Sequence, residues 1–177
     1  ALSLSLQSKD TLRIARSFNN LGNVLTSMHQ YDTAYAKLLL SIQFYNKIKE
    51  IKSLAHPLSN IGKIHLDFKR YDSAVYYYEK TVAIASAFHD HFELAQTFKR
   101  LAMIYFETNN FERAVVYCDS SLGISRQHNY RYIIADDYDI LAKIFLAKKD
   151  YRQAREMLNK SLKLYLEMSL KPSIPYR

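Results

Sequence analysis

Residues 58–84 read LSNIGKIHLDFKRYDSAVYYYEKTVAI, and the rest of the chain repeats the pattern that this segment contains. Apolar and small residues recur at helical spacing on both sides of the polar segment Lys69-Arg70-Tyr71-Asp72. This arrangement predicts two amphipathic helices joined by a short turn, with Asp72 placed to cap the second helix. Residues 58–84 are therefore predicted to form a helical hairpin.

The hairpin pattern returns when the sequence is shifted by 40 residues in either direction. Three sets of positions carry it, namely an apolar residue followed by Gly or Ala, an aromatic residue, and an alanine. They are Leu21-Gly22, Ile61-Gly62, Leu101-Ala102 and Leu141-Ala142; Tyr31, Tyr71, Phe111 and Tyr151; and Ala34, Ala74, Ala114 and Ala154. Small residues let paired helices approach closely, and one such pair cannot bury its apolar face alone. The chain is therefore predicted to be an array of stacked helical repeats.

The 40-residue spacing also predicts where the elements lie. We expect first helices near residues 12–28, 52–68, 92–108 and 131–148, and second helices near residues 31–48, 71–88, 111–127 and 151–168. The four repeats are then residues 11–50, 51–90, 91–130 and 131–170. Residues 1–10 align with second helices, so we expect the second helix of a truncated repeat there, ending in a turn at Asp10-Thr11. Residues 171–177 would be the start of a further repeat or a tail.

Composition agrees with a helical globular chain. The 177 residues are 49% hydrophobic and 24% charged, and only 3 Gly and 3 Pro interrupt them, which suits long helices with short connectors. No apolar segment approaches the length of a transmembrane helix, and no signal peptide precedes the first repeat. We therefore expect a cytoplasmic location, or a periplasmic one if a leader was removed. The net charge of +8 is spread along the chain, which argues only weakly for nucleic acid.

The small and aromatic positions of this pattern resemble the tetratricopeptide repeat. A further aromatic position of that repeat falls at Phe18, Leu58, Phe98 and Tyr138, and three of these four residues comply. The resemblance covers essentially the whole chain and implies an all-α, right-handed superhelical solenoid of antiparallel helix pairs, with four repeats and a leading half repeat. The 40-residue period resembles the longer-helix subset, which includes Pins-type scaffolds, peptide-pheromone regulators, and sensor modules of bacterial histidine kinases or transcription regulators.

The resemblance implies that the first helices line a concave groove for a peptide or partner helix. Its residues would be Arg16, Asn19, Asn20, Asn23, Asn60, Lys63, Lys99, Arg100, Met103, Asp139 and Lys143. Asparagine amides both donate to and accept from a peptide backbone, and lysine or arginine attracts carboxylates. The two-carboxylate clamp of chaperone cofactors is matched only in part, because Asn19 and Gln96 stand where that clamp has lysines. A solvated polar helix face is the alternative for the asparagines.

Two clusters of potential metal ligands have a simpler structural interpretation. The clusters are Asp136, Asp137 and Asp139, and the connector residues His89, His91 and His128. We expect the acids to occupy the first turns of a helix, where its dipole favours them, and the histidines lack the spacing of zinc sites. The single Cys118 aligns with Leu38 and Tyr78, which predicts a buried hydrophobe rather than a nucleophile. With no phosphate loop or nucleophile–base motif, we expect no enzyme, no cofactor and no metal.

The sequence thus predicts a scaffold that binds a protein or peptide segment, as the sensor or interaction portion of a larger bacterial signalling or regulatory protein. The alternatives are a nucleic-acid-binding helical repeat and a peptide-pheromone-type regulator domain. Acidic residues at predicted groove positions, such as Asp136 and Asp139, argue against nucleic acid, and we expect no direct membrane insertion. End-to-end self-association is also expected, because apolar residues lie near both ends. These residues are Leu2, Leu4, Leu6, Leu158, Leu162, Leu164, Tyr165, Leu166 and Met168.

Overall fold

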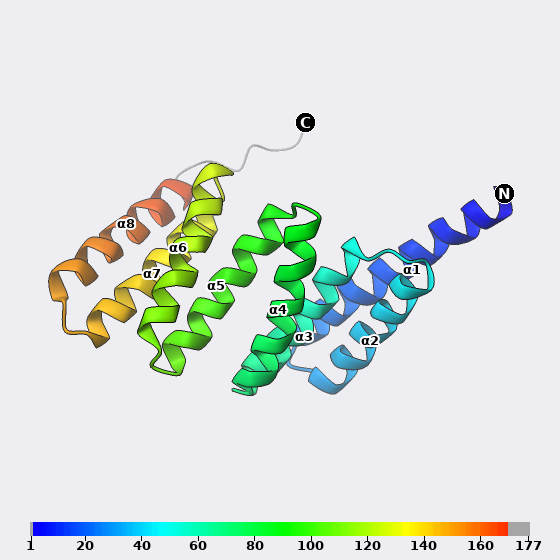
Figure 1. Ribbon diagram of the computed structural model, residues 1–177, viewed down its shortest axis with the longest axis horizontal. Coiled ribbons are helices and arrows are strands. Elements are labelled where there is room, and N and C mark those ends of the chain that lie inside the picture. The colour runs from blue at the N-terminus through cyan, green and yellow to red at the C-terminus, as the bar shows by residue number, and fades with distance from the viewer. Residues whose placement is uncertain (1, 170–177) are drawn as a thin grey trace. The chain divides into compact units, whose positions relative to one another are not determined.

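The computed structural model describes the backbone of residues 2–169 and the side chains of residues 10–169. Over this range the ordered elements are all helical (Figure 1). They are α1 (Leu2–Ser27), α2 (Tyr31–Lys47), the 3₁₀-helix η1 (Lys52–Leu54), α3 (Ala55–Asp67), α4 (Tyr71–Ala87), α5 (His91–Glu107), α6 (Phe111–Gln127), α7 (Arg131–Ala147) and α8 (Tyr151–Ser169). The predicted second helices are confirmed to within one residue at each end.

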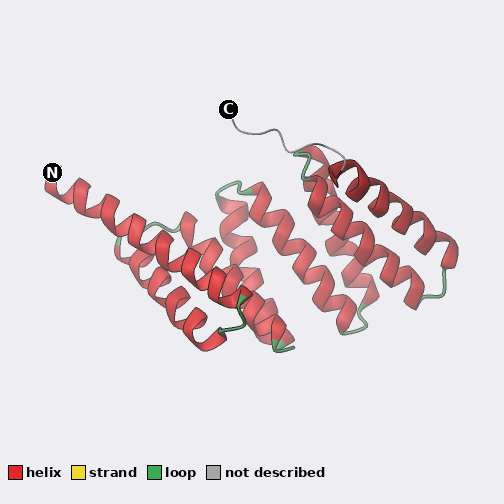
Figure 2. Cartoon of the chain, turned by 180° about the vertical axis from the view of Figure 1, so that it is seen from behind, coloured by secondary structure: helices red, strands yellow, loops and turns green. Residues whose placement is uncertain are grey.

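Within each compact unit, consecutive helices run antiparallel and are joined by short turns (Figure 2). The chain forms two compact units, residues 1–93 and 94–177. In the first unit, α1 packs on α2 and α3 packs on α4, while α3 also contacts both α1 and α2. In the second unit, α7 packs on both α6 and α8. The predicted all-α architecture of helix pairs is therefore confirmed.

Close approach of the paired helices depends on the small residues of the repeat pattern. A Cβ atom added at Gly22 would lie 2.7 Å from the side chain of Leu38, and one added at Gly62 would lie 2.7 Å from the ring of Tyr78. Both partners are completely buried on the following helix. The alanines of the repeat pattern on the second helices are likewise buried, namely Ala34, Ala74, Ala114 and Ala154. The role assigned to these positions from sequence is thus confirmed by direct contact.

A buried hydroxyl joins the two helices within each of three repeats, which the sequence analysis did not anticipate. The Ser41 hydroxyl donates to the carbonyl oxygen of Ala15 at 2.8 Å, and Ser121 donates to Ala95 at 3.1 Å. Thr81 reaches the carbonyl oxygen of Ala55 at 3.5 Å. In each case the accepting carbonyl belongs to an alanine, whose small side chain lets the hydroxyl approach the backbone of the partner helix. These contacts recur every 40 residues and fix the register of each pair.

The turns between helices also recur, at half the repeat spacing. Among the described residues, seven adopt the left-handed conformation, with φ between 53° and 61°: His29, Lys49, Lys69, His89, Asn109, Asn129 and Lys149. At one of these turns the Lys69 N–H donates to the Leu66 carbonyl at 2.8 Å, and the Arg70 N–H donates to the His65 carbonyl at 2.9 Å. This pair of bonds is the Schellman motif, in which glycine is the usual left-handed residue. Here lysine, histidine or asparagine occupies the position.

Replacing Lys69 by glycine should therefore stabilise the chain. A side chain in the left-handed region costs about 1 kcal/mol, and glycine avoids that cost. We expect Lys69→Gly to raise the free energy of unfolding by up to about 1 kcal/mol in chemical denaturation. Lys80→Gly, inside the regular helix α4, serves as control and should lower it by about 1 kcal/mol. A loss of stability at both positions would contradict the prediction.

One predicted feature is wrong, namely the turn at Asp10-Thr11. Helix α1 continues without a break from Leu2 to Ser27 (Figure 1). The segment from Ser8 to Leu12 contains neither glycine nor proline. Within the described residues, no earlier helix is available against which residues 2–8 could fold back. Uninterrupted helical hydrogen bonding therefore prevails. The side chains of Leu2, Leu4 and Leu6, and residues 170–177, lie outside the described part.

Candidate functional site

We use the name first-helix face for the eleven predicted groove residues, which lie on α1 and α3 in the first unit and on α5 and α7 in the second. None of the eleven is buried. The exposed ones are Arg16, Asn20, Asn23, Met103 and Lys143, and the half-buried ones are Asn19, Asn60, Lys63, Lys99, Arg100 and Asp139. Ser59 stands at the repeat position of Asn19, and Ile140 stands at the repeat position of Arg100. Both are buried and belong to the core. In each unit, neighbouring first helices are linked by the side chains described next.

In the first unit, amide groups connect the first helices. Asn60 Nδ2 on α3 donates to Asn19 Oδ1 on α1 at 3.1 Å. Asn19 Nδ2 in turn lies 3.5 Å from Asn20 Oδ1. Asn23 follows one helical turn later on the same side of α1 and is exposed. The result is a row of amides with spare donors and acceptors for a bound backbone.

A histidine and a carboxylate join α3 to the start of α5. His56 Nδ1 lies 3.2 Å from Glu93 Oε2, and the Glu93 side chain is almost completely buried. The hydrogen bond to Glu93 raises the pKa of His56, although partial burial and the charge of Arg16 oppose this. His56 therefore carries a larger fraction of positive charge near neutral pH than an isolated histidine would. Its partner Glu93 was not singled out from sequence.

In the second unit, Lys99 is neutralised by its own neighbours. Lys99 Nζ on α5 lies 2.5 Å from Asp136 Oδ2 on α7, and the Tyr165 hydroxyl on α8 donates to Asp136 Oδ1 at 2.5 Å. Burial and the Asp136 carboxylate raise the pKa of Tyr165, so this hydroxyl stays protonated. Lys99 was expected to attract a ligand carboxylate, but an internal carboxylate already occupies it. Other predicted cations of the first-helix face are Arg100 on α5 and Lys143 on α7 in this unit, and Lys63 on α3 in the first unit.

Asp137 departs most from the sequence interpretation. It was expected to be one of the acids in the first turns of a helix, and its side chain is completely buried. Burial raises the pKa of Asp137 to about 7, and the Ser121 hydroxyl and the Lys99 charge offset this only in part. Position 137 of the repeat pattern corresponds to Thr97, which is also buried. The alignment of Asp137 with Thr97 is the sequence feature that could have predicted its burial.

An aromatic cleft of about 350 Å³ lies between α2 and the end of α3. Its lining includes Tyr31, Tyr35, His65 and Phe68. The His65 ring stacks on Tyr77 at 5.3 Å, and burial lowers the pKa of His65, which keeps the ring neutral. The equivalent pair in the second unit, Tyr105 and Tyr117, stacks at the same distance. Recurrence in both units indicates that the stack is a structural feature of the repeat.

Cys118 is buried, as predicted, and burial raises the pKa of its thiol. The thiol is therefore protonated and unsuited to nucleophilic attack. Over the described residues, no three His, Cys, Asp or Glu side chains are grouped to hold a metal ion. None of the helices in that range combines the length and apolar character needed to span a membrane.

Comparison with known proteins agrees with this geometry. The family model for the tetratricopeptide repeat matches residues 13–87, 53–127 and 93–167. The crystal structure of BtubC (BKLC) from P. vanneervenii matches with a TM-score of 0.76 and 15% identity, over 92% of this chain and 67% of that chain. The crystal structure of MamA matches with a TM-score of 0.65 and 12% identity, over 92% and 86%. At these identities the two structures establish the fold alone.

A search of curated protein sequences finds no significant match. Tetratricopeptide repeats form scaffolds for interaction with protein or peptide partners, and they are generally not enzymes. The matched residues, 13–167, are most of the sequence and include all the second helices and the recurring hydroxyl contacts described above. This chain belongs to the tetratricopeptide repeat family.

Proposed function

We propose that the first-helix face docks an extended peptide segment and that the amides of the first unit hold its backbone. The hydrogen bond of 3.1 Å between Asn60 and Asn19 is the observation that carries the proposal. It aligns amides from neighbouring helices, and Asn20 and Asn23 remain exposed beside it. A peptide backbone needs such paired donors and acceptors at intervals along its length. Asparagine is otherwise a poor residue for a helix interior.

Electrostatics supports an acidic or neutral peptide over a basic one. Arg16 and His56 add positive charge next to the amides, and the pKa of His56 is raised by Glu93. Lys63 adds a further positive charge on α3 in the first unit, and Arg100 adds one on α5 in the second. The Lys99–Asp136 pair contributes no net charge. We further propose that the chain serves as the cytoplasmic interaction or sensor portion of a larger bacterial regulator, on the strength of its 40-residue repeat alone.

The test uses an array of synthetic peptides, from which the tightest binder is taken into calorimetry. We expect an affinity near micromolar, about −8 kcal/mol. Replacing Asn60 and Arg100 together by alanine should weaken it about tenfold or more, because two hydrogen-bonding groups are lost. Asn46→Ala with Lys47→Ala, an exposed amide and cation on α2, is the matched control and should bind normally. Unchanged affinity in a folded Asn60→Ala, Arg100→Ala variant would refute this site.

A nucleic-acid partner is the alternative, and the same face argues against it. Asp136 neutralises Lys99, and Asp139 adds a further negative charge on α7. Binding driven by phosphate contacts weakens steeply as salt rises. We expect any association with RNA or DNA to be lost at physiological ionic strength. Sequence-selective binding that survives such salt would favour nucleic acid over the peptide proposal.

A further inference from the structure

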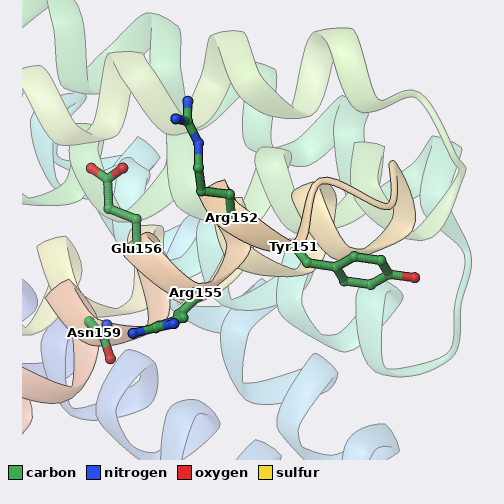
Figure 3. A pocket seen from close by; sticks show the side chains of 5 residues that line it. All are labelled: Tyr151, Arg152, Arg155, Glu156 and Asn159. Carbon is green, nitrogen blue, oxygen red and sulfur yellow. The ribbon is translucent and has the colours of Figure 1, made fainter.

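Helix α8 carries an exposed surface that the first-helix face does not include. We call it the α8 outer face: Tyr151, Arg152, Arg155, Leu158, Leu162 and Leu166. Leu158, Leu162 and Leu166 are 45%, 56% and 51% exposed and follow one another at four-residue intervals along the helix. Tyr151, Arg152 and Arg155, with Glu156 and Asn159, line an open cleft at its N-terminal half (Figure 3). The figure shows Arg155 extending along α8 toward Asn159.

Leu158 and Leu162 occupy positions that are buried or half-buried in the other second helices, whereas Leu166 corresponds to the exposed residues Asn46, Ser86 and Arg126. Leu158 corresponds to Leu38, Tyr78 and Cys118, all of which are completely buried. Leu162 corresponds to Leu122, which is 3% exposed and packs in the core formed with α7. The α8 outer face is therefore built as one side of a helix–helix interface.

The arginines break the pattern of the other second helices. Position 155 corresponds to Tyr35, Val75 and Val115, and position 152 corresponds to Asp32, Asp72 and Glu112. Thus α8 has a cation where the other three helices have an apolar residue, and another where they have an acid. Glu156 departs in the opposite sense, because it corresponds to Ala36, Tyr76 and Val116, but the three positions together still carry a net positive charge. They point to an occupant different from another repeat of this chain.

The two arginines differ in how far their charge is compensated within the described part of the chain. Arg152 interacts electrostatically with Asp150 and Glu156. Glu156 also pairs with Lys160 at 2.6 Å, and Glu167 pairs with Arg131. Among residues 10–169, no salt bridge reaches Arg155. A row of exposed leucines thus lies beside a guanidinium group without a salt bridge, and such a group binds carboxylates in a fork geometry.

We propose that the α8 outer face docks an amphipathic helix of a partner protein, with acidic residues beside its apolar stripe. The leucines pack against the apolar stripe of the partner helix, as α6 packs against α7 in the second unit. Arg152 and Arg155 pair with the acids, which sets the partner's register and orientation. The surface is separate from the first-helix face, so this inference does not depend on the peptide proposal.

A second copy of this chain is a poorer occupant. The complementary surface would be α1, where Leu21 and Val24 are exposed. However, the described side chains of α1 include Arg13 and Arg16 and only one acid, Asp10. Placing α1 against α8 would bring cations together, which disfavours association. An acidic helix meets both the apolar and the charged requirements of the face.

The probe is a synthetic helical peptide with leucines on one stripe and glutamates beside it, together with a twin in which lysine replaces every glutamate. Fluorescence anisotropy should show that the glutamate peptide binds the 177-residue chain at least about tenfold more tightly than the lysine twin. Arg155→Val and Arg152→Asp should each weaken binding of the glutamate peptide by about tenfold. Both changes install residue types found at the same position in other repeats, so the fold should be retained.

Lys47 provides matched controls, because it is exposed on α2 and away from α8 in sequence. Lys47→Val changes the net charge as Arg155→Val does, and Lys47→Asp changes it as Arg152→Asp does. Neither control should affect binding, and nor should Asn60→Ala with Arg100→Ala on the first-helix face. That separation distinguishes failure of this inference from failure of the peptide proposal.

Several outcomes would overturn the inference. Equal binding of the two peptides would remove the role of the arginines, as would unchanged affinity in their variants. Binding to phosphatidylserine vesicles that Arg152→Asp abolishes, without binding of the glutamate peptide, would identify an anionic membrane as the occupant. A mass that rises with concentration in light scattering, and that Leu162→Asp reduces to the monomer, would identify a second copy.

Discussion

Raising the pH from about 4 to about 8 should lower the free energy of unfolding by up to about 4 kcal/mol through Asp137 alone. Burial raises the pKa of Asp137 in the folded chain from 3.8 to about 7. The folded state therefore holds this proton more tightly than the unfolded state does. The stabilisation is complete below the unfolded pKa, declines as pH rises, and is lost above about pH 7.

Asn in place of Asp137 isolates this effect, because the amide has the same shape and does not ionise. Chemical denaturation from pH 4.5 to pH 8.5 should show Asp137→Asn to be much less sensitive to pH and more stable than the native chain at the alkaline end. His56 contributes a slope of the same sign, since its pKa is also raised, but both proteins share it. Asp139→Asn, at a half-buried site on the same helix, should keep the native slope. Parallel curves for the native chain and Asp137→Asn would contradict the prediction.

The placement of the helices could be predicted from sequence because spacing alone determines it. Four copies of a 40-residue pattern align the small residues, and contacts such as Gly62 with Tyr78 then follow from helix geometry. The eleven groove positions implied by the family resemblance are all exposed or half-buried, whereas Ser59 and Ile140, at equivalent positions of other repeats, are buried. The second helices were thus predictable to within one residue at each end, whereas the start of α1 was not.

Features that depend on pairs of side chains could not be predicted in this way. The Lys99–Asp136–Tyr165 network joins residues on three helices, and no spacing rule selects it over other partners. The left-handed turns escaped notice because lysine and histidine occupy them in place of glycine. Asp137 was misinterpreted because acids in early helical turns are usually solvated, and packing overrode that tendency. In each case a tertiary contact outweighed a local preference.

Leu141 and Leu21 occupy the same position of the repeat but differ sharply in environment. Leu141 is 6% exposed and packs in the core with Cys118 and Leu122, whereas Leu21 is 43% exposed on α1. We expect Leu141→Ala to lower the free energy of unfolding by about 3 kcal/mol, because it removes buried methyl groups and leaves a cavity. Leu21→Ala should cost less than about 1 kcal/mol.

Both alanine variants are compared with the native chain by circular dichroism in a urea titration. Neither substitution changes the net charge or introduces a polar group. Alanine suits both helices equally, so helix propensity cancels between the two sites. The difference therefore reports how much apolar surface each leucine buries in this chain. Equal losses at both positions would mean that Leu21 is covered in solution, by a second copy or by residues outside the described part. A concentration-dependent loss at Leu21 alone would then identify α1 as a surface of self-association.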